Sequence, residues 1–185
     1  MILAAISKLL LKLWGWKITG NYPYDLVKKI FVVAPHTSNW DFPLGLLTRA
    51  AVNDKIKFIG KKSLFKPPHG WIFYGLGGIP VDRTARNSFV DSVVQQFESR
   101  ERLAIALAPE GTRKKVEKFK TGYYYIAVQA NVPIVPIVLN WETREVMFLD
   151  AIHLTGDAEK ELAQVEQIFI PYKGKRKELS FGKDH

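Results

Sequence analysis

A histidine and an aspartate follow a β-branched apolar run early in the chain. The run Ile30–Val33 ends at Pro35, and His36, Ser38 and Asp41 come next. His36 and Asp41 are five positions apart, which places them about 140° apart around a helix. The pair therefore needs a loop or the start of a helix. If the chain turns there, the Asp41 carboxylate can accept a hydrogen bond from one imidazole nitrogen and leave the other free as a general base.

Two further polar motifs each follow an apolar run and end in an arginine. They are Gly77–Arg83 and Ala108–Arg113, and the apolar segment Val132–Val138 follows them. The planar guanidinium presents paired donors that suit bidentate binding of a phosphate. The alternative for Arg83 and Arg113 is ordinary ion pairing with Asp82 or Glu110.

The order and spacing of these four segments, over residues 30 to 140, resemble the glycerolipid acyltransferase superfamily. The resemblance implies catalysis by His36 and Asp41, and acceptor-phosphate binding and ordering of the site by Arg83, Glu110, Gly111, Thr112 and Arg113. A substrate-binding lysine of the family corresponds to Lys62, where Ser63 replaces the glutamate that usually follows. Many members carry asparagine directly before the histidine, where this chain has Pro35.

The resemblance implies transfer of an acyl group from acyl-CoA or acyl carrier protein to the free hydroxyl of lysophosphatidic acid, giving phosphatidic acid. It implies no cofactor and no metal. Another lysophospholipid or an amino-lipid could be the acceptor for the same chemistry, and water in place of the alcohol would make a hydrolase. A basic membrane- or RNA-binding module without catalysis would explain the charge, but not three polar motifs after three strands.

The elements that must position these residues alternate between strand and helix patterns. They predict an α/β fold, a mixed and mostly parallel sheet flanked by helices, as in glycerol-3-phosphate acyltransferases, with an N-terminal amphipathic helix. If the strands run parallel, His36, Arg83 and Glu110 emerge along one edge of the sheet, where open α/β folds bind ligands. The predicted strands are Ile30–Val33, Ile56–Ile59, Ile79–Val81, Leu103–Ala108, Val132–Leu139 and Glu145–Leu149. The predicted helices are 1–16, 40–52, one beginning at Asn87 or Ser88, 122–130 and 157–168.

The amino-acid composition limits the kinds of partner and excludes several kinds of site. The chain has 185 residues, which suits one domain, and a net charge of +9, which attracts anionic lipids, phosphorylated substrates or nucleic acid. It contains no cysteine, which excludes disulfides, thiolate zinc sites and cysteine nucleophiles. With no Gly-x-Ser-x-Gly motif either, direct transfer in a ternary complex is favoured over an acyl-enzyme.

Residues 1–20 are expected to be an amphipathic helix in the membrane interface, and residues 21–185 a single acyltransferase domain. Lys8 and Lys12 lie four apart on one face of a segment that is too short to span a bilayer. The alternative is a helix packed on the protein's own core. We expect a cytoplasmic protein, peripheral at the inner face of the membrane, with a lysophospholipid, an acyl donor and the membrane surface as partners and without nucleic acid.

Four smaller expectations concern packing. Core packing is expected for the aromatic cluster Trp71–Tyr74, and core or rim positions for the three tyrosines of Gly122–Ala130. Pro133 and Pro136 indicate an edge strand or an irregular start, because proline lacks the donor that a ladder needs. The charge run 173–177 is expected to be a solvated end.

Overall fold

A single sheet organises the chain, in the strand order β1-β7-β6-β2-β5-β3-β4. The computed structural model describes residues 2–81 and 86–182. The strands are β1 (Lys17–Gly20), β2 (Lys28–Ala34), β3 (Ile56–Lys61), β4 (Gly78–Val81), β5 (Leu103–Leu107), β6 (Ile134–Asn140) and β7 (Glu145–Phe148). The helices are α1 (Ile2–Leu13), α2 (Asp41–Ala51), α3 (Gly70–Gly75), α4 (Arg86–Glu98), α5 (Gly122–Gln129) and α6 (Ala158–Phe169), with 3-10 turns η1 (Lys62–Phe65) and η2 (Lys177–Leu179).

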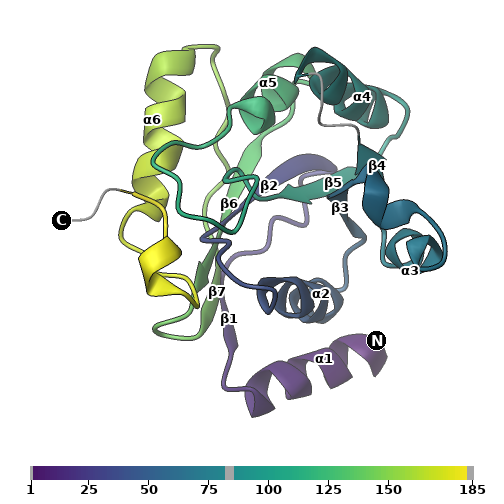
Figure 1. Ribbon diagram of the computed structural model, residues 1–185, viewed down its shortest axis with the longest axis vertical. Helices are drawn as coiled ribbons and strands as arrows, with labels where there is room; N and C mark the ends of the chain where they lie inside the picture. Colours follow the sequence, from purple (N-terminus) through teal and green to yellow (C-terminus); the bar gives the residue numbers. More distant parts are fainter. Residues whose placement is uncertain (1, 82–85, 183–185) are drawn as a thin grey trace.

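Five neighbouring strands, β6, β2, β5, β3 and β4, run parallel, and β7 is antiparallel to β6. The central strand β2 pairs Ile30 with Ile105 on one side and with Ile134 on the other. The expected mixed, mostly parallel sheet flanked by helices is therefore confirmed. Because the five strands are parallel, their carboxyl ends meet along one edge of the sheet (Figure 1).

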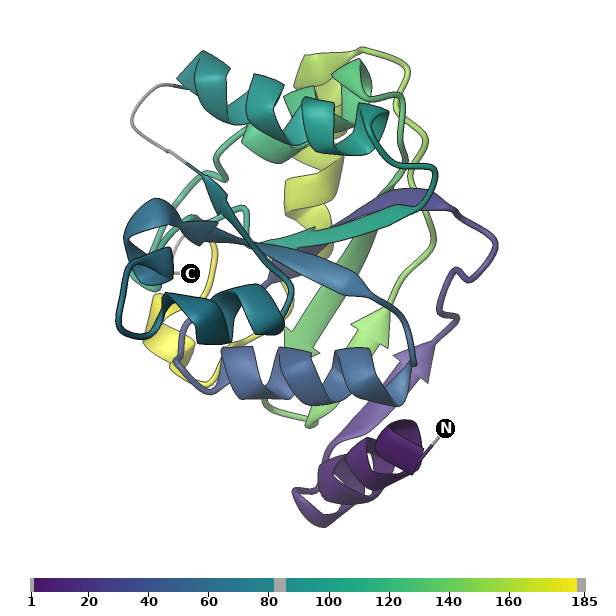
Figure 2. The ribbon, with the colours of Figure 1, turned by 90° about the vertical axis from the view of Figure 1, so that its right-hand side faces the viewer.

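Helices cover both faces of the sheet, which explains why β2 and β6 are almost continuously apolar. Figure 2 shows α4, α5 and α6 on one side of the sheet and α2 on the other, with α1 lying outside α2. The first face buries Phe97, Ile126 and Phe169 from the three helices, whereas the second buries Leu11 and Leu44 from α1 and α2. The fold thus has two cores, one on each face.

α1, α2, α4, α5 and α6 lie where the apolar periodicity predicts helices, including the N-terminal amphipathic helix, whereas α3 was not predicted. Asp157 caps α6 by accepting a hydrogen bond from the backbone N–H of Lys160 at 3.3 Å. In α5, Tyr123 and Tyr124 are buried and Tyr125 is 37% exposed, so the expectation of core and rim positions is confirmed.

Three features differ from the expectations. Lys17–Gly20 forms the edge strand β1, which pairs with Glu145–Phe148. β6 is an interior strand between β7 and β2, so of the two expected alternatives, an edge strand or an irregular start, the edge strand was wrong. Pro133 precedes the strand, which begins at Ile134. The strand tolerates Pro136 because the carbonyl of this residue bonds to Leu149 beyond the end of the β7 ladder, and the missing donor falls on that same side.

The aromatic cluster on α3 is also placed differently, since Trp71 is 73% exposed and Tyr74 is 55% exposed. Core packing was the wrong expectation because Phe65 of η1 already fills the space beneath the helix. A Cβ added to Gly60 or Gly78 would lie 2.8 or 2.7 Å from the Phe65 ring, so this ring packs directly on the backbone of β3 and β4. Trp71 is thereby left on the outside.

Candidate functional site

The candidate site lies at the carboxyl ends of β2, β5 and β6, which are neighbours in the sheet. His36 follows β2 by two residues, Glu110 follows β5 by three, and Trp141 follows β6 directly. The loop after β2 leads into α2, whose first residue is Asp41. The parallel strands therefore bring together side chains that are more than 100 positions apart in the sequence.

The predicted His-Asp pair forms. His36 Nδ1 lies 3.2 Å from Asp41 Oδ2, and the imidazole is 24% exposed whereas the carboxylate is 1% exposed. With Nδ1 directed at the carboxylate, Nε2 is the nitrogen left for a substrate proton. The geometry is that of a general base held in one tautomer by a buried acceptor.

Two other donors hold the Asp41 carboxylate in place. The backbone N–H of Ser38 donates to Oδ2 at 2.8 Å, and the indole Nε1–H of Trp141 donates to Oδ1 at 2.9 Å. Each oxygen of this buried carboxylate thus accepts at least one hydrogen bond, as a buried charge requires. Asp41 can orient His36 without moving.

Glu110 lies behind the histidine and not at the surface. Its carboxylate oxygens accept from the backbone N–H of His36 at 3.1 and 2.9 Å, and the residue is 2% exposed. Burial raises the pKa of Glu110 to about 8, and the nearby Asp41 adds to the rise, although the hydrogen bond from His36 opposes it. Glu110 is therefore placed to fix the backbone of the histidine.

The next three residues of this motif turn outward. Gly111 has φ +65°, and a Cβ there would lie 2.8 Å from the Lys120 side chain, so glycine suits this turn. Thr112 Oγ1 accepts from the backbone N–H of Lys114 at 3.2 Å. Arg113 is exposed.

The remaining predicted residues are farther along the same edge or lie outside the described part. Lys62 is exposed at the start of η1, directly after β3, which is separated from β2 by β5. Arg83 lies outside the described residues.

Sequence reasoning missed Trp141, the donor to Asp41. The available signal was its position, since it follows a parallel strand just as His36 and Glu110 do. Trp141 also belongs to a cluster of four indole rings. Its ring centroid lies 4.8 Å from that of Trp16 and 6.2 Å from that of Trp14, and the Trp14 ring lies 5.8 Å from that of Trp40. This cluster joins the end of α1 to the His36–Asp41 loop.

The charge run 173–177 was expected to be a solvated end. Lys175, Arg176 and Lys177 are exposed in agreement with this expectation, but the chain around them is anchored to the protein. Gly174, Ser180 and Phe181 are buried. The ring centroid of Phe181 lies 4.0 Å from that of Phe119, and this apolar anchor returns the chain to the protein. The lysines and the arginine of the run are thereby held near the candidate site.

Two further findings concern metal sites and membrane-spanning helices. Across residues 2–81 and 86–182, no group of three or more His, Cys, Asp or Glu side chains is arranged to hold a metal ion. Within the same ranges, no helix has the length and apolarity that crossing a membrane demands.

Comparisons with known proteins point to one family. The profile of the Acyltransferase family matches residues 18–140. The 1-acyl-sn-glycerol-3-phosphate acyltransferase of Salmonella typhimurium is 33% identical over 138 residues, which cover 69% of this chain and 54% of the relative. The human 1-acyl-sn-glycerol-3-phosphate acyltransferase beta is 37% identical over 114 residues, 58% of this chain and 40% of the relative.

A solved structure is similar as well. The crystal structure of the 1-acyl-sn-glycerophosphate acyltransferase PlsC from Thermotoga maritima superposes with a TM-score of 0.59 and 21% identity, covering 90% of this chain and 75% of that one. This likeness concerns the fold. The chain spans about half the length of the Salmonella relative. From its profile match, the identity to its relatives and its fold, the chain belongs to the acyltransferase family.

Proposed function

We propose that this protein transfers an acyl group from a thioester to the free hydroxyl of lysophosphatidic acid, 1-acyl-sn-glycerol 3-phosphate, giving phosphatidic acid. The observation that carries the proposal is the His36–Asp41 pair, at 3.2 Å, with its carboxylate held by Ser38 and Trp141. His36 is the general base and Asp41 its orienting acceptor. The names of the relatives, 1-acyl-sn-glycerol-3-phosphate acyltransferases, support this acceptor.

The reaction needs one proton shuttle. Nε2 of His36 takes the proton of the acceptor hydroxyl as its oxygen attacks the thioester carbonyl carbon. Asp41 stabilises the imidazolium that forms. The tetrahedral intermediate then breaks its C–S bond, the thiolate leaves and takes the proton from the imidazolium, and the new ester and a free thiol remain. General-base assistance of this kind contributes about 10²- to 10⁴-fold.

The transfer is direct, without an acyl-enzyme. The sequence has no cysteine. The Ser38 hydroxyl in the same loop belongs to a residue that is 8% exposed and accepts from the backbone N–H of Trp40 at 3.2 Å. Such a hydroxyl serves as part of the loop. Acyl-CoA and acyl carrier protein are both suitable donors, since each presents the thioester on a phosphopantetheine arm and the basic surface attracts both.

The first test is acyl transfer with a radiolabelled donor. Acyl-CoA and acyl carrier protein are each offered with lysophosphatidic acid, lysophosphatidylcholine or glycerol 3-phosphate, using wild-type protein and the His36→Ala variant. We expect phosphatidic acid from the wild type and a loss of at least about 10²-fold in His36→Ala. The matched control is His153→Ala, because His153 is exposed and lies between β7 and α6, far along the chain from the catalytic loop. Equal activity of His36→Ala would refute the proposed base, and preferred lysophosphatidylcholine acylation would change the acceptor.

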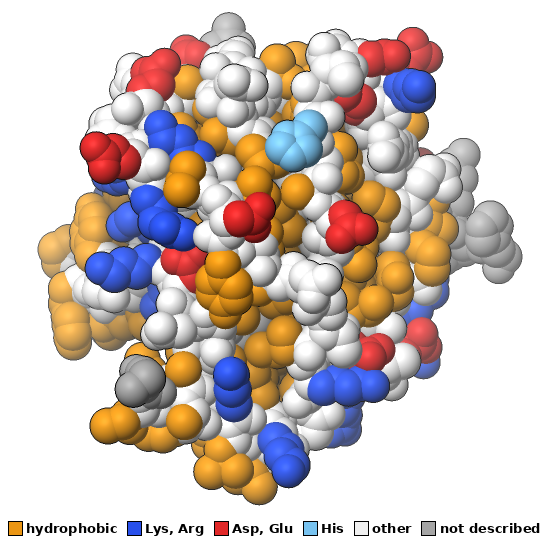
Figure 3. All heavy atoms as spheres, turned by 180° about the vertical axis from the view of Figure 1, so that it is seen from behind, with side chains coloured by type: hydrophobic (Ala, Val, Ile, Leu, Met, Phe, Trp, Pro, Cys, Tyr) orange, Lys and Arg blue, Asp and Glu red, His pale blue; other side chains and the backbone are white. Residues whose placement is uncertain are grey.

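The same proposal includes a position on the membrane surface. α1 buries Ser7 and Leu11 and leaves a row of large apolar side chains exposed. These are Ile2, Leu3, Ile6, Leu9, Leu10 and Leu13, with exposed fractions from 45% to 79%. Figure 3 shows hydrophobic side chains gathered along the lower edge of the molecule, over α1. A helix with such a face and with lysines beside it suits the headgroup boundary of a bilayer.

The net charge of +9 favours the cytoplasmic leaflet, whose anionic lipids attract basic proteins. Sedimentation with vesicles tests this placement. We expect wild-type protein to bind vesicles that contain phosphatidylglycerol, and the Leu9→Ser/Leu13→Ser double variant to bind at least about tenfold more weakly, because each buried side chain contributes about 1.5 kcal/mol or more. The matched control, Leu64→Ser, changes an exposed leucine on η1. Unchanged binding of the double variant would show that α1 does not carry the contact.

A further inference from the structure

Residues 171–181, named here the C-terminal strap, are fixed to the protein at both ends. The backbone N–H of Trp141 donates to the carbonyl of Lys173 at 3.1 Å, and Phe181 is buried at 3% exposure. Between them, the backbone N–H of Gly174 donates to Ser180 Oγ at 3.0 Å, which closes the strap into a loop. The strap follows the part of the chain that the family profile matches, residues 18–140.

The strap lies against the catalytic loop. The backbone N–H of Arg176 donates to Thr37 Oγ1 at 3.1 Å, and Thr37 is the residue after the proposed base. A Cβ added to Gly174 would lie 2.4 Å from the same Oγ1, so the Thr37 side chain packs directly on the backbone of Gly174, where there is no room for a larger residue. Thr37 itself is 2% exposed because the strap covers it.

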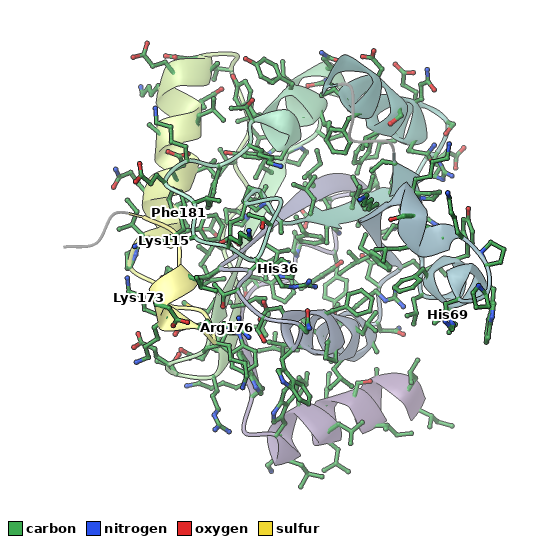
Figure 4. All side chains as sticks on the ribbon, viewed as in Figure 1. His36, His69, Lys115, Lys173, Arg176 and Phe181 are labelled. Carbon is green, nitrogen blue, oxygen red and sulfur yellow. The ribbon has the colours of Figure 1, made fainter. Side chains whose placement is uncertain are left out.

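The strap carries four cationic side chains, Lys173, Lys175, Arg176 and Lys177, and they differ in their interaction partners. Lys177 pairs with Glu142, with Nζ to Oε1 at 2.6 Å, and Lys175 Nζ lies 4.7 Å from the centroid of the Trp141 ring. Within the described residues, the Lys173 ammonium and the Arg176 guanidinium make no hydrogen bond or ion pair. Figure 4 shows both on the same side of His36 as Lys115.

We propose that the strap forms a phosphate-binding subsite beside the catalytic loop, in which Lys173 and Arg176 bind a phosphate group of a substrate. This rests on the proposed function for the identity of that substrate. In lysophosphatidic acid, the phosphate is attached to the carbon next to the one that bears the reacting hydroxyl, so a hydroxyl held at His36 brings its phosphate close to the residues around Thr37. The donor CoA also carries phosphates, and the chemistry of recognition is the same.

Charge and geometry both favour a phosphate here. The guanidinium of Arg176 offers paired donors, and Lys173 supplies a second positive charge three residues earlier along the strap. Three carboxylates near the loop already have partners: Asp41 and Glu110 are buried and hydrogen-bonded, and Glu142 is paired with Lys177. Within the described residues, no ion pair joins Glu178 of the strap to Lys173 or Arg176.

The test separates the two sources of phosphate by using substrates that lack it. Arg176→Ala, Lys173→Ala and the control Lys160→Ala, an exposed lysine on α6, are assayed with lysophosphatidic acid and with monoacylglycerol as acceptors, and with acyl-CoA and acyl-pantetheine as donors. For the two strap variants we expect KM for the phosphorylated substrate to rise by about tenfold or more, with kcat changed less than threefold. KM for the substrate without the phosphate stays at its wild-type value.

The substrate whose KM rises identifies the phosphate that the subsite binds. A rise in KM for lysophosphatidic acid assigns the subsite to the acceptor, and a rise for acyl-CoA assigns it to the donor. Unchanged KM for both, or equal loss with and without the phosphate, overturns the subsite. A calorimetric titration of lysophosphatidic acid micelles needs no turnover. Weaker binding by Arg176→Ala than by Lys160→Ala would support the subsite even if the wild type did not acylate this lipid. Equal binding of both this lipid and CoA, titrated in the same way, would overturn it.

Discussion

The two sides of the candidate site differ in how completely their side chains are bound. On the catalytic side, Asp41 and Glu110 are buried and every one of their carboxylate oxygens accepts a hydrogen bond. On the cationic side, Arg113 and Arg176 are exposed, and their guanidinium groups bond to no described residue. The comparison suggests a division of work. In the proposed reaction, the His36–Asp41 pair is organised before substrate arrives, whereas the exposed arginines would gain their anionic partner only from the substrate.

Removing the charge of Asp41 is expected to have the largest effect, because it would disturb the bound side of the site. In Asp41→Asn the side-chain amide would donate to Nδ1 of His36, so Nε2 would carry the proton and lose its basicity. We expect kcat to fall by about 10²- to 10⁴-fold. Steady-state kinetics with lysophosphatidic acid measures it, and Asp150→Asn, at an exposed position, is the control. A variant that keeps a tenth of the wild-type kcat would contradict the orienting role.

For Glu110, the burial of the bound side can be tested by the pH dependence of the free energy of unfolding. Burial raises the pKa of its carboxyl from 4.5 to about 8 in the folded protein. Between these values the unfolded chain releases the proton and the folded protein keeps it, so the free energy of unfolding falls as pH rises through this window. Glu110→Gln lacks this titration. We expect its stability relative to wild type to increase from pH 4.5 to 8, by at most about 4 kcal/mol.

Urea unfolding at pH 5 and at pH 8 measures this effect. The matched control is Glu117→Gln, since Glu117 is an exposed carboxylate in the same loop. Stability differences that are the same at both pH values would mean that Glu110 does not titrate in this window.

Arg113 tests the cationic side and has the smallest expected effect. Arg113→Ala should raise KM for lysophosphatidic acid by about tenfold, because a charged hydrogen bond is lost, and should leave kcat within about threefold. Lys114→Ala, the exposed neighbour, is the control. A fall in kcat with an unchanged KM would place Arg113 with the chemistry and would remove the distinction between the two sides.

Much of the fold, and the His36–Asp41 pair of the site, follow from the local sequence pattern. Apolar runs that end in polar motifs predict the parallel strands, and His36 and Asp41 are close enough in sequence for a turn to join them. Local pattern gives the position of Trp141 after a strand, but it predicts neither the partner of Trp141 nor that of Gly174. Their partners, Asp41 and Thr37, lie more than 99 positions away, and only tertiary packing brings them together. A charge run is a local sign of solvation, and it does not reveal that Phe181 anchors the chain beyond it.

The four-tryptophan cluster has a consequence for the proposed reaction at a membrane surface. Its rings connect the end of α1 to the loop of His36, so a helix resting in a bilayer would hold the base at a fixed height above the surface. The acceptor would then be found by lateral diffusion, a search in two dimensions. Its turnover would follow the mole fraction of acceptor among the surrounding lipids, and diluting the surface with inert phospholipid would slow the reaction even at constant bulk concentration.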